Sequence, residues 1–171
     1  MQDQAVPAQL RRALHRRMEN LLQRAMRHYG VNLPAVKIGL DIRGTVAGCA
    51  YPAELKVRFN PVLLQGNPEG FLHEVVAHEI AHLVAFQVHG RRIRPHGPEW
   101  AAVMNLYGVE PRRCHGFDID RIEVRRQRRH RYLCACNEHA LSTTRHNRVR
   151  RGEQQYLCRR CGETLVELPK R

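Results

Sequence analysis

Apolar residues recur at every third or fourth position in several stretches of the chain, a spacing that places them on one face of a helix. The first stretch covers residues 7–29, and Gly30 directly after it is a typical stop signal. A second long helix is expected from about residue 68 to residue 89, where Gly90 ends it. A third is expected to open at His96-Gly97-Pro98 and to end near residue 107.

Alternating and β-branched residues predict strands in two further segments, 36–42 and 55–59. Glycines and a proline between these segments indicate a turn and a further short strand at about 46–51. Asn60-Pro61 then has the sequence of a helix start. Together the helices and strands predict an α+β fold.

Length and composition exclude several classes of protein. The 171 residues suit one domain with a small appendage, and an apolar content of 43% is too high for a disordered chain. No stretch approaches the roughly 18 apolar residues of a membrane-spanning helix, so we expect no membrane partner. Because the N-terminal residues lack the apolar core of a secretory signal, we expect a cytoplasmic protein. Six cysteines in such a compartment indicate metal binding rather than disulfides.

Positive charge is concentrated toward the end of the chain. The formal net charge is +13, and arginine supplies 26 of the 29 cationic residues. Residues 1–111 contain 13 cations and 9 acids, whereas residues 112–171 contain 16 and 7. We therefore divide the chain into a core at 1–111, a basic connector at 112–130 and a cysteine-bearing region at 131–171.

An HExxH motif, His78-Glu79-Ile80-Ala81-His82, lies in the middle of the second long helix. Residues four apart lie one turn above each other, so both imidazoles can reach one metal ion. Glu79 lies about 100° round the helix from His78, where its carboxylate can stand beside a metal-bound water without ligating the metal. The flanking residues are apolar, and burying two histidines and a glutamate among them is unfavourable without a metal partner.

A catalytic zinc ion usually has three protein ligands and one open position. The best third candidate is His96, fourteen positions after His82, because the turn between them can bring it back over the helix. His89 is the nearer competitor, and Glu99 is a more distant one.

A family resemblance rests on these residues. The run HEVVAHEIAHL followed by HGPEW resembles the SprT-like zinc metallopeptidases, whose eukaryotic relative is Spartan. The segment NPVLL at 60–64 and the cysteine-containing tail also match, so the resemblance extends from the first helix to Cys161. It implies a small zincin-like (minigelatinase-like) metallopeptidase core with a C-terminal zinc ribbon at 131–171. Eukaryotic members cleave proteins crosslinked to DNA. The residues that it assigns are the zinc ligands His78, His82 and His96 and the catalytic base Glu79.

In this mechanism Glu79 takes a proton from zinc-activated water and later delivers it to the leaving amine. The oxyanion stabiliser stays open between Tyr107 and the arginine-rich turn at 91–94. Glycines around Cys49 indicate either close approach by an extended substrate or a tight hairpin. Cys49 and Cys114 are expected to be small buried residues without a ligand role.

The cysteines of the tail have the spacing of a second, structural zinc site. Residues 158–161 form a CxxC knuckle, and about 20 residues earlier an irregular CxC occupies 134–136. His139 competes with the second cysteine of that CxC, and His146 is a more distant candidate. Because thiolate binds zinc more strongly than imidazole, we favour an all-cysteine site. Its ligands are then Cys134, Cys136, Cys158 and Cys161.

Arginines are dense on both sides of the first cysteine pair. Guanidinium groups at this density favour contact with phosphate, so we expect binding to DNA, single-stranded or non-specific, that is sequence-independent and strongly salt-sensitive. Tyr132, Tyr156 and His130 are candidates for stacking on bases. The arginines concerned are Arg121, Arg125, Arg126, Arg128, Arg129, Arg131, Arg145, Arg148, Arg150 and Arg151.

These features predict a metallopeptidase with one catalytic and one structural zinc ion, acting on protein substrates that are bound or crosslinked to DNA. An alternative from another class is a nucleic-acid-binding zinc adaptor whose HExxH site is structural or weakly active. A third is a metallohydrolase that acts on a different bond. Turnover by variants at Glu79 distinguishes the first two.

Overall fold

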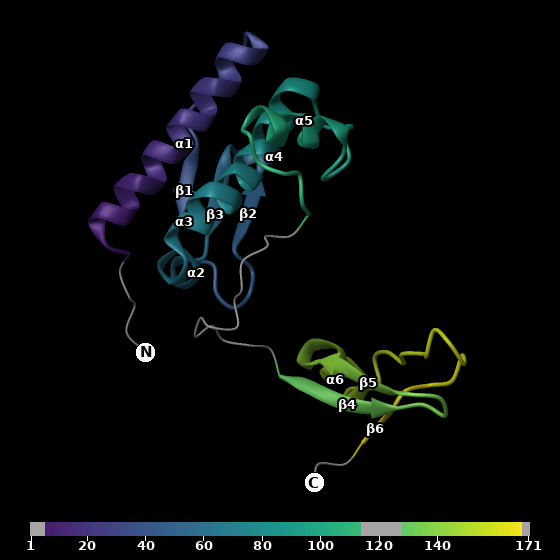
Figure 1. Ribbon diagram of the computed structural model, residues 1–171. Helices are drawn as coiled ribbons and strands as arrows, with labels where there is room; N and C mark the ends of the chain where they lie inside the picture. Colours follow the sequence, from purple (N-terminus) through teal and green to yellow (C-terminus); the bar gives the residue numbers. More distant parts are fainter. Residues whose placement is uncertain (1–5, 114–127, 169–171) are drawn as a thin grey trace. The chain divides into compact units, whose positions relative to one another are not determined.

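The computed structural model describes residues 6–113 and 128–168 (Figure 1). The chain divides into two compact units, Met1–Arg125 and Arg126–Arg171. Each unit has a hydrophobic core and a three-stranded sheet of its own. In the part of the chain that is described, no helix is long and apolar enough to cross a membrane.

The first unit combines a small sheet with several helices, in agreement with the α+β prediction. Strand β3 lies in the middle of the sheet, parallel to β1 and antiparallel to β2. Strand β2 is therefore an edge strand. The elements in chain order are α1 (Ala8–Tyr29), β1 (Lys37–Gly39), β2 (Gly48–Tyr51), η1 (Pro52–Glu54), β3 (Lys56–Phe59), α2 (Pro61–Gly66), α3 (Pro68–Gly70), η2 (Phe71–Val75), α4 (Val76–His89) and α5 (Pro98–Leu106).

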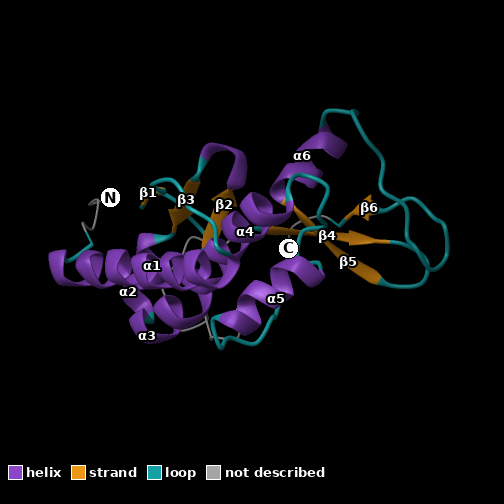
Figure 2. Cartoon of the chain, turned by 90° about the horizontal axis from the view of Figure 1, so that it is seen from above, coloured by secondary structure: helices purple, strands orange, loops and turns teal. Residues whose placement is uncertain are grey.

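The first two long helices begin and end close to where the apolar spacing predicts. Helix α1 ends at Gly30, which adopts the left-handed conformation (φ 65°) that favours glycine. The second helical run starts as α3 and passes through the π-helical segment η2 into α4, which Gly90 ends at a φ of 82°. Helix α4 packs against α1, α5 and β2 (Figure 2), and its apolar residues belong to the buried core of the first unit.

Asn60 joins the sheet to the loop that precedes β2. Its side-chain oxygen accepts from the backbone N–H groups of Val62 and Leu63, which caps α2 and confirms the predicted helix start. Its Nδ2 atom donates to the carbonyl oxygens of Gly44 and Val46 at 2.8 and 3.1 Å. The residue is fully buried, so this one amide holds the start of β2 in place.

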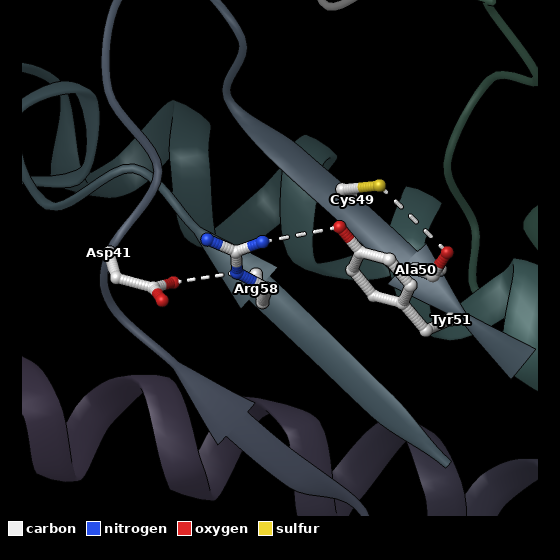
Figure 3. A network of polar contacts seen from close by, with 5 residues as sticks. All are labelled: Asp41, Cys49, Ala50, Tyr51 and Arg58. Atoms are coloured by element: carbon white, nitrogen blue, oxygen red, sulfur yellow. Dashed lines mark hydrogen bonds and ion pairs between the residues drawn. The ribbon is translucent and has the colours of Figure 1, made fainter. Parts of the chain in front are cut away.

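The two faces of the sheet differ in chemistry. On β3, Val57 and Phe59 are buried in the core, whereas the alternate residues face outward. Among these, Arg58 donates from Nε to Asp41 at 2.8 Å and from an Nη atom to the hydroxyl of Tyr51 at 3.3 Å (Figure 3). The helices pack on the buried face, and it is the buried face that meets α4.

The second unit is a small antiparallel sheet with one helix. Strand β4 (Arg129–Leu133) pairs with β5 (Glu138–Ser142) on one side and with β6 (Val166–Glu167) on the other. Helix α6 (Thr143–Arg150) follows β5 directly. The core of this unit is small and consists of Tyr132, Cys134, Leu141, Cys158 and Leu165.

Candidate metal centre and active-site cleft

Three histidines of the first unit converge on one point. His78 and His82 lie one turn apart on α4, with their Nε2 atoms 3.2 Å apart. The Nε2 atom of His96 lies 3.0 Å from that of His78 and 3.1 Å from that of His82. Two nitrogen ligands of a tetrahedral zinc ion are about 3.3 Å apart at the usual bond length. The three imidazoles therefore fit the ligand set of a single ion with a fourth position to spare.

The loop between α4 and α5 carries His96 back toward α4. Within it, the backbone N–H of Gly97 donates to the carbonyl of Arg94 at 2.9 Å and closes a turn. His96 itself adopts a φ of 57°, which is uncommon for a residue other than glycine. Strained backbone of this kind persists only where its surroundings hold it, and it is typical of functional sites.

The competing third ligands lie elsewhere. His89 packs edge-on against Tyr29, with ring centroids 6.1 Å apart. Glu99 does not join the three-histidine group. Two nearby buried atoms, Oε2 of Glu99 and Nδ1 of His96, have no hydrogen-bond partner among the described residues.

Burial favours the neutral, cation-binding form of two of these imidazoles. Burial, together with the neighbouring His78 and His96, lowers the pKa of His82 to about 3. Burial and the nearby Arg113 lower the pKa of His96. Trp100 adds packing, since its indole N–H donates to the carbonyl of His78 at 3.3 Å and its ring stacks on His82 with centroids 5.5 Å apart. No role was predicted for Trp100, because its contacts with His78 and His82 depend on how α5 packs on α4.

Glu79 is buried beside the three histidines, with only 8% of its surface exposed. Burial raises the pKa of Glu79 to about 7, and a hydrogen bond from the backbone of Ala50 opposes that shift. The carboxylate stands outside the group of candidate ligands and lies against Gly48 of β2. A carboxyl group with a pKa near neutrality can both accept and release a proton at pH 7.

A cleft of about 750 Å³ contains the three histidines and Glu79. Its lining comes from the edge strand β2 with its flanking turns, from α4 and α5, and from residues 91–96 and 109–113. Arg91, Arg94 and Arg113 bring positive charge to it. Residues 109–113 were not among the predicted site residues, because nothing in their local pattern places them near the motif.

Two expectations about individual cleft residues need correction. Tyr107 does not reach the cleft: its hydroxyl is buried, and burial and the neighbouring Tyr29 of α1 raise its pKa. Of the two candidate oxyanion stabilisers, only the turn at 91–94 lines the cleft. Cys49 is half-buried rather than buried, and it also lines the cleft. Cys114 lies outside the described residues.

Four cysteines converge in the second unit. The Sγ atom of Cys136 lies 3.5 Å from that of Cys134 and 3.6 Å from that of Cys158, and Cys161 belongs to the same group. Thiolate ligands of a tetrahedral zinc ion are about 3.8 Å apart, so the group fits a structural zinc site. His139 lies beside it, with its Nε2 atom 3.2 Å from the Sγ atom of Cys134, and this hydrogen bond raises the pKa of His139.

His146 lies apart from the cysteine group and contacts other residues. Its ring stacks on that of His130 with centroids 3.6 Å apart and planes inclined by 9°, and its Nδ1 atom is 3.0 Å from the hydroxyl of Tyr132. Glu167 lies 3.7 Å from the same Nδ1 atom. His130, His146 and Glu167 offer ligand atoms within 4.8 Å of one another, but the two imidazole planes are stacked in parallel, so a single ion cannot lie in both ring planes as it can at the three histidines of the cleft.

The arginines of the second unit lie mostly on its surface. Arg131 pairs with Glu138, and Arg151 pairs with Glu153 at 2.6 Å. Three members of the predicted basic set, Arg121, Arg125 and Arg126, lie outside the described residues. The exposed described members are Arg128, Arg129, Arg131, Arg145, Arg148, Arg150 and Arg151.

The three candidates for base stacking differ in how accessible their rings are. Tyr132 is fully buried in the core of the second unit, so the expectation that it stacks on bases is wrong. One face of His130 is occupied by His146. Tyr156 is half-buried, and the guanidinium of Arg145 lies 5.5 Å from its ring centroid.

Comparison with known proteins agrees with the resemblance that the motifs carry. The model of the SprT-like family matches residues 14–128. The chain belongs to the SprT-like family. Proteins named Protein SprT match it over 167 residues, or 97% of this SprT-like chain. The one from Cronobacter sakazakii is 42% identical with 98% of its length covered, that from Yersinia enterocolitica 41% with 96%, and that from Escherichia coli K12 42% with 99%. No solved structure matches this SprT-like chain.

Proposed function

We propose that this protein is a zinc metallopeptidase with a zincin-like (minigelatinase-like) core. The observation that carries the proposal is the convergence of His78, His82 and His96 beside the buried carboxyl of Glu79. Zinc held by the three imidazoles would polarise the scissile carbonyl and lower the pKa of a bound water. Glu79 would accept the proton of the attacking water and donate it to the leaving amine.

The cleft suits an extended peptide. Strand β2 is at the edge of its sheet, so one row of its backbone groups is open to a further strand. Residues 45–52, which contain β2, line the cleft next to the candidate metal centre. A substrate backbone paired there would lie beside Glu79, whose carboxylate already accepts from the N–H of Ala50 on this strand. This supports the substrate interpretation of the glycines near Cys49 over a hairpin with a purely structural role.

We further propose that the substrates are proteins bound or crosslinked to DNA, and that the protein acts in the cytoplasm. The exposed arginines of the second unit support phosphate contact, and their spread over β4 and α6 supports binding that does not depend on sequence. A structural zinc ion held by Cys134, Cys136, Cys158 and Cys161 would stabilise this unit, whose hydrophobic core is too small to fold well unaided.

Cleavage of a DNA-binding protein, with and without single-stranded DNA, tests the proposal. The intact chain should cleave, DNA should increase the rate, and Glu79→Gln should lose turnover on the order of 10²- to 10⁴-fold while both zinc ions stay bound. Absence of cleavage by the zinc-loaded intact chain, with tight DNA binding, would instead support the adaptor function.

A further inference from the structure

Gly48, the first residue of β2, lies against the side chain of Glu79 without any space between them. A Cβ atom at position 48 would lie 2.7 Å from Cγ, 2.8 Å from Oε1 and 3.0 Å from Cδ of Glu79. Contacts below about 3.0 Å do not occur for real Cβ atoms. The missing side chain of Gly48 is therefore the space that the Glu79 side chain occupies.

The backbone conformation of Gly48 does not itself require glycine. Its φ lies outside the left-handed region, and it pairs with Phe59 in a regular antiparallel register. Glycine in a strand weakens it relative to alanine, because it has more conformational freedom to lose and no side chain to pack. The one advantage of glycine over alanine at position 48 is therefore the space that it leaves for the Glu79 side chain.

Both partners are held by hydrogen bonds, so making room for a larger residue at position 48 would disturb at least one of these bonds. Glu79 is on α4 and buried, and its carboxylate accepts a hydrogen bond from the backbone of Ala50. On the strand side, the N–H of Asn60 donates to the carbonyl of Ala47 at 2.8 Å, and the Asn60 amide also holds the loop before it. A methyl group at position 48 would therefore push the carboxylate away from β2.

We infer that Gly48 is a positioning residue for Glu79. The bare backbone of Gly48 and the N–H of Ala50 together form a seat on the edge strand that fixes the direction of the carboxylate. The contact between Gly48 and Glu79 follows from the geometry alone. Its effect on turnover rests on the proposed peptidase function. A displacement of a reacting group by about 1 Å can lower turnover by as much as 100-fold.

A double-mutant cycle on the zinc-loaded 171-residue chain tests the contact without an activity assay. Unfolding in urea is followed by the fluorescence of the single tryptophan, Trp100, which lies in the first unit. Gly48→Ala should lower the midpoint when Glu79 is present and should not lower it in the Glu79→Ala background, where the space is free. An equal decrease in both backgrounds would overturn the inference.

Gly39→Ala is the matched control in the same sheet. A Cβ atom there would meet side-chain atoms of Asp41 and Arg58 at 3.0 and 3.1 Å, and both side chains are on the outward face where they can shift. The effect of Gly39→Ala should be the same with and without Glu79. Dependence on Glu79 at this remote position would show that the cycle reports general destabilisation and would overturn the inference.

Kinetics test the positioning role. Gly48→Ala should lower kcat by tenfold or more with KM and zinc content unchanged, which a merely destabilised protein would not show. An unchanged kcat in a folded Gly48→Ala protein would overturn the inference even if the cycle shows coupling. If the unmutated chain does not cleave at all, the proposed function fails, and the cycle still decides whether Gly48 seats Glu79.

Discussion

The Nε2 atoms of His78 and His96 lie 3.0 Å apart, although helix α4 and the following loop separate the two residues along the chain. In a neutral imidazole the Nε2 atom either donates one hydrogen bond or accepts one. Three Nε2 atoms that are all this close to one another therefore cannot all be paired by hydrogen bonds, and a cation is the natural occupant of the point where they meet. The backbone strain at His96 is consistent with a site that is held ready for that cation.

The identity of the third ligand can be tested by metal content. His96→Ala should reduce the zinc bound per chain from two to one, because two imidazoles alone hold zinc weakly. His89→Ala is the control, since His89 packs on Tyr29 away from the site and should leave both ions in place. Elemental analysis after gel filtration measures both. Loss of zinc from His89→Ala with retention in His96→Ala would contradict the assignment.

The burial of Glu79 predicts a pH dependence of stability in metal-free protein. The pKa of Glu79 is raised to about 7 in the folded state from an ordinary value of 4.5, so between these values the folded state binds more protons. Stability relative to Glu79→Gln should therefore fall as the pH rises from about 4.5 to 7, by on the order of 2–3 kcal/mol. Urea unfolding of both proteins at pH 5 and pH 8, followed through Trp100, measures the difference. Parallel pH profiles would contradict it.

Added zinc should reduce this difference. A divalent cation beside the carboxylate favours its charged form and opposes the effect of burial. The unfolding experiment is repeated with zinc, and a difference that stays unchanged on zinc addition would show that Glu79 does not face the metal.

The cysteine group predicts a structural role for one zinc ion. Cys158→Ser should lose one zinc of two and unfold the second unit, while the first unit keeps its Trp100 fluorescence and its own zinc. Cys49→Ser provides the control, because Cys49 belongs to none of the three groups of candidate ligands among the described residues. A preparation of the intact chain with a single zinc ion would rule out the two-site assignment.

The arginines of α6 predict a salt-dependent affinity for DNA. Raising the salt from about 50 to 200 mM should weaken binding steeply, and the double variant Arg148→Glu/Arg150→Glu should lower the slope by about one for each phosphate that it no longer neutralises. Arg12→Glu/Arg16→Glu on α1 removes the same charge from the first unit and is the control. Fluorescence anisotropy with labelled single-stranded DNA measures both. Affinity that does not change with salt would exclude phosphate binding by these arginines.

Local signals in the sequence were sufficient for the helices and for the HExxH motif. Gly30 and Gly90 end α1 and α4 at the predicted positions, and Asn60 caps α2, because each of these signals acts within one turn of the backbone. The strands were also located, although β1 is shorter than its apolar segment.

Contacts between distant segments were not accessible in the same way. The space that Gly48 leaves for Glu79 depends on how β2 packs on α4, and no local pattern encodes it. Tyr132 is a second example of a position that the local sequence did not reveal. A tyrosine within an arginine run suggests a surface residue, but the alternation of side chains along β4 directs Tyr132 into the core.

The buried amide of Asn60 has a consequence for which proteins the proposed peptidase would cut. Because its hydrogen bonds join the loop before β2 to the start of α2, they brace the side of the cleft that contacts Glu79 against widening. A cleft that cannot widen on that side admits a single extended strand more readily than a folded surface. Folded neighbouring proteins would therefore not be cut, whereas unfolded segments of a protein would fit the cleft and be cut because of their extended shape.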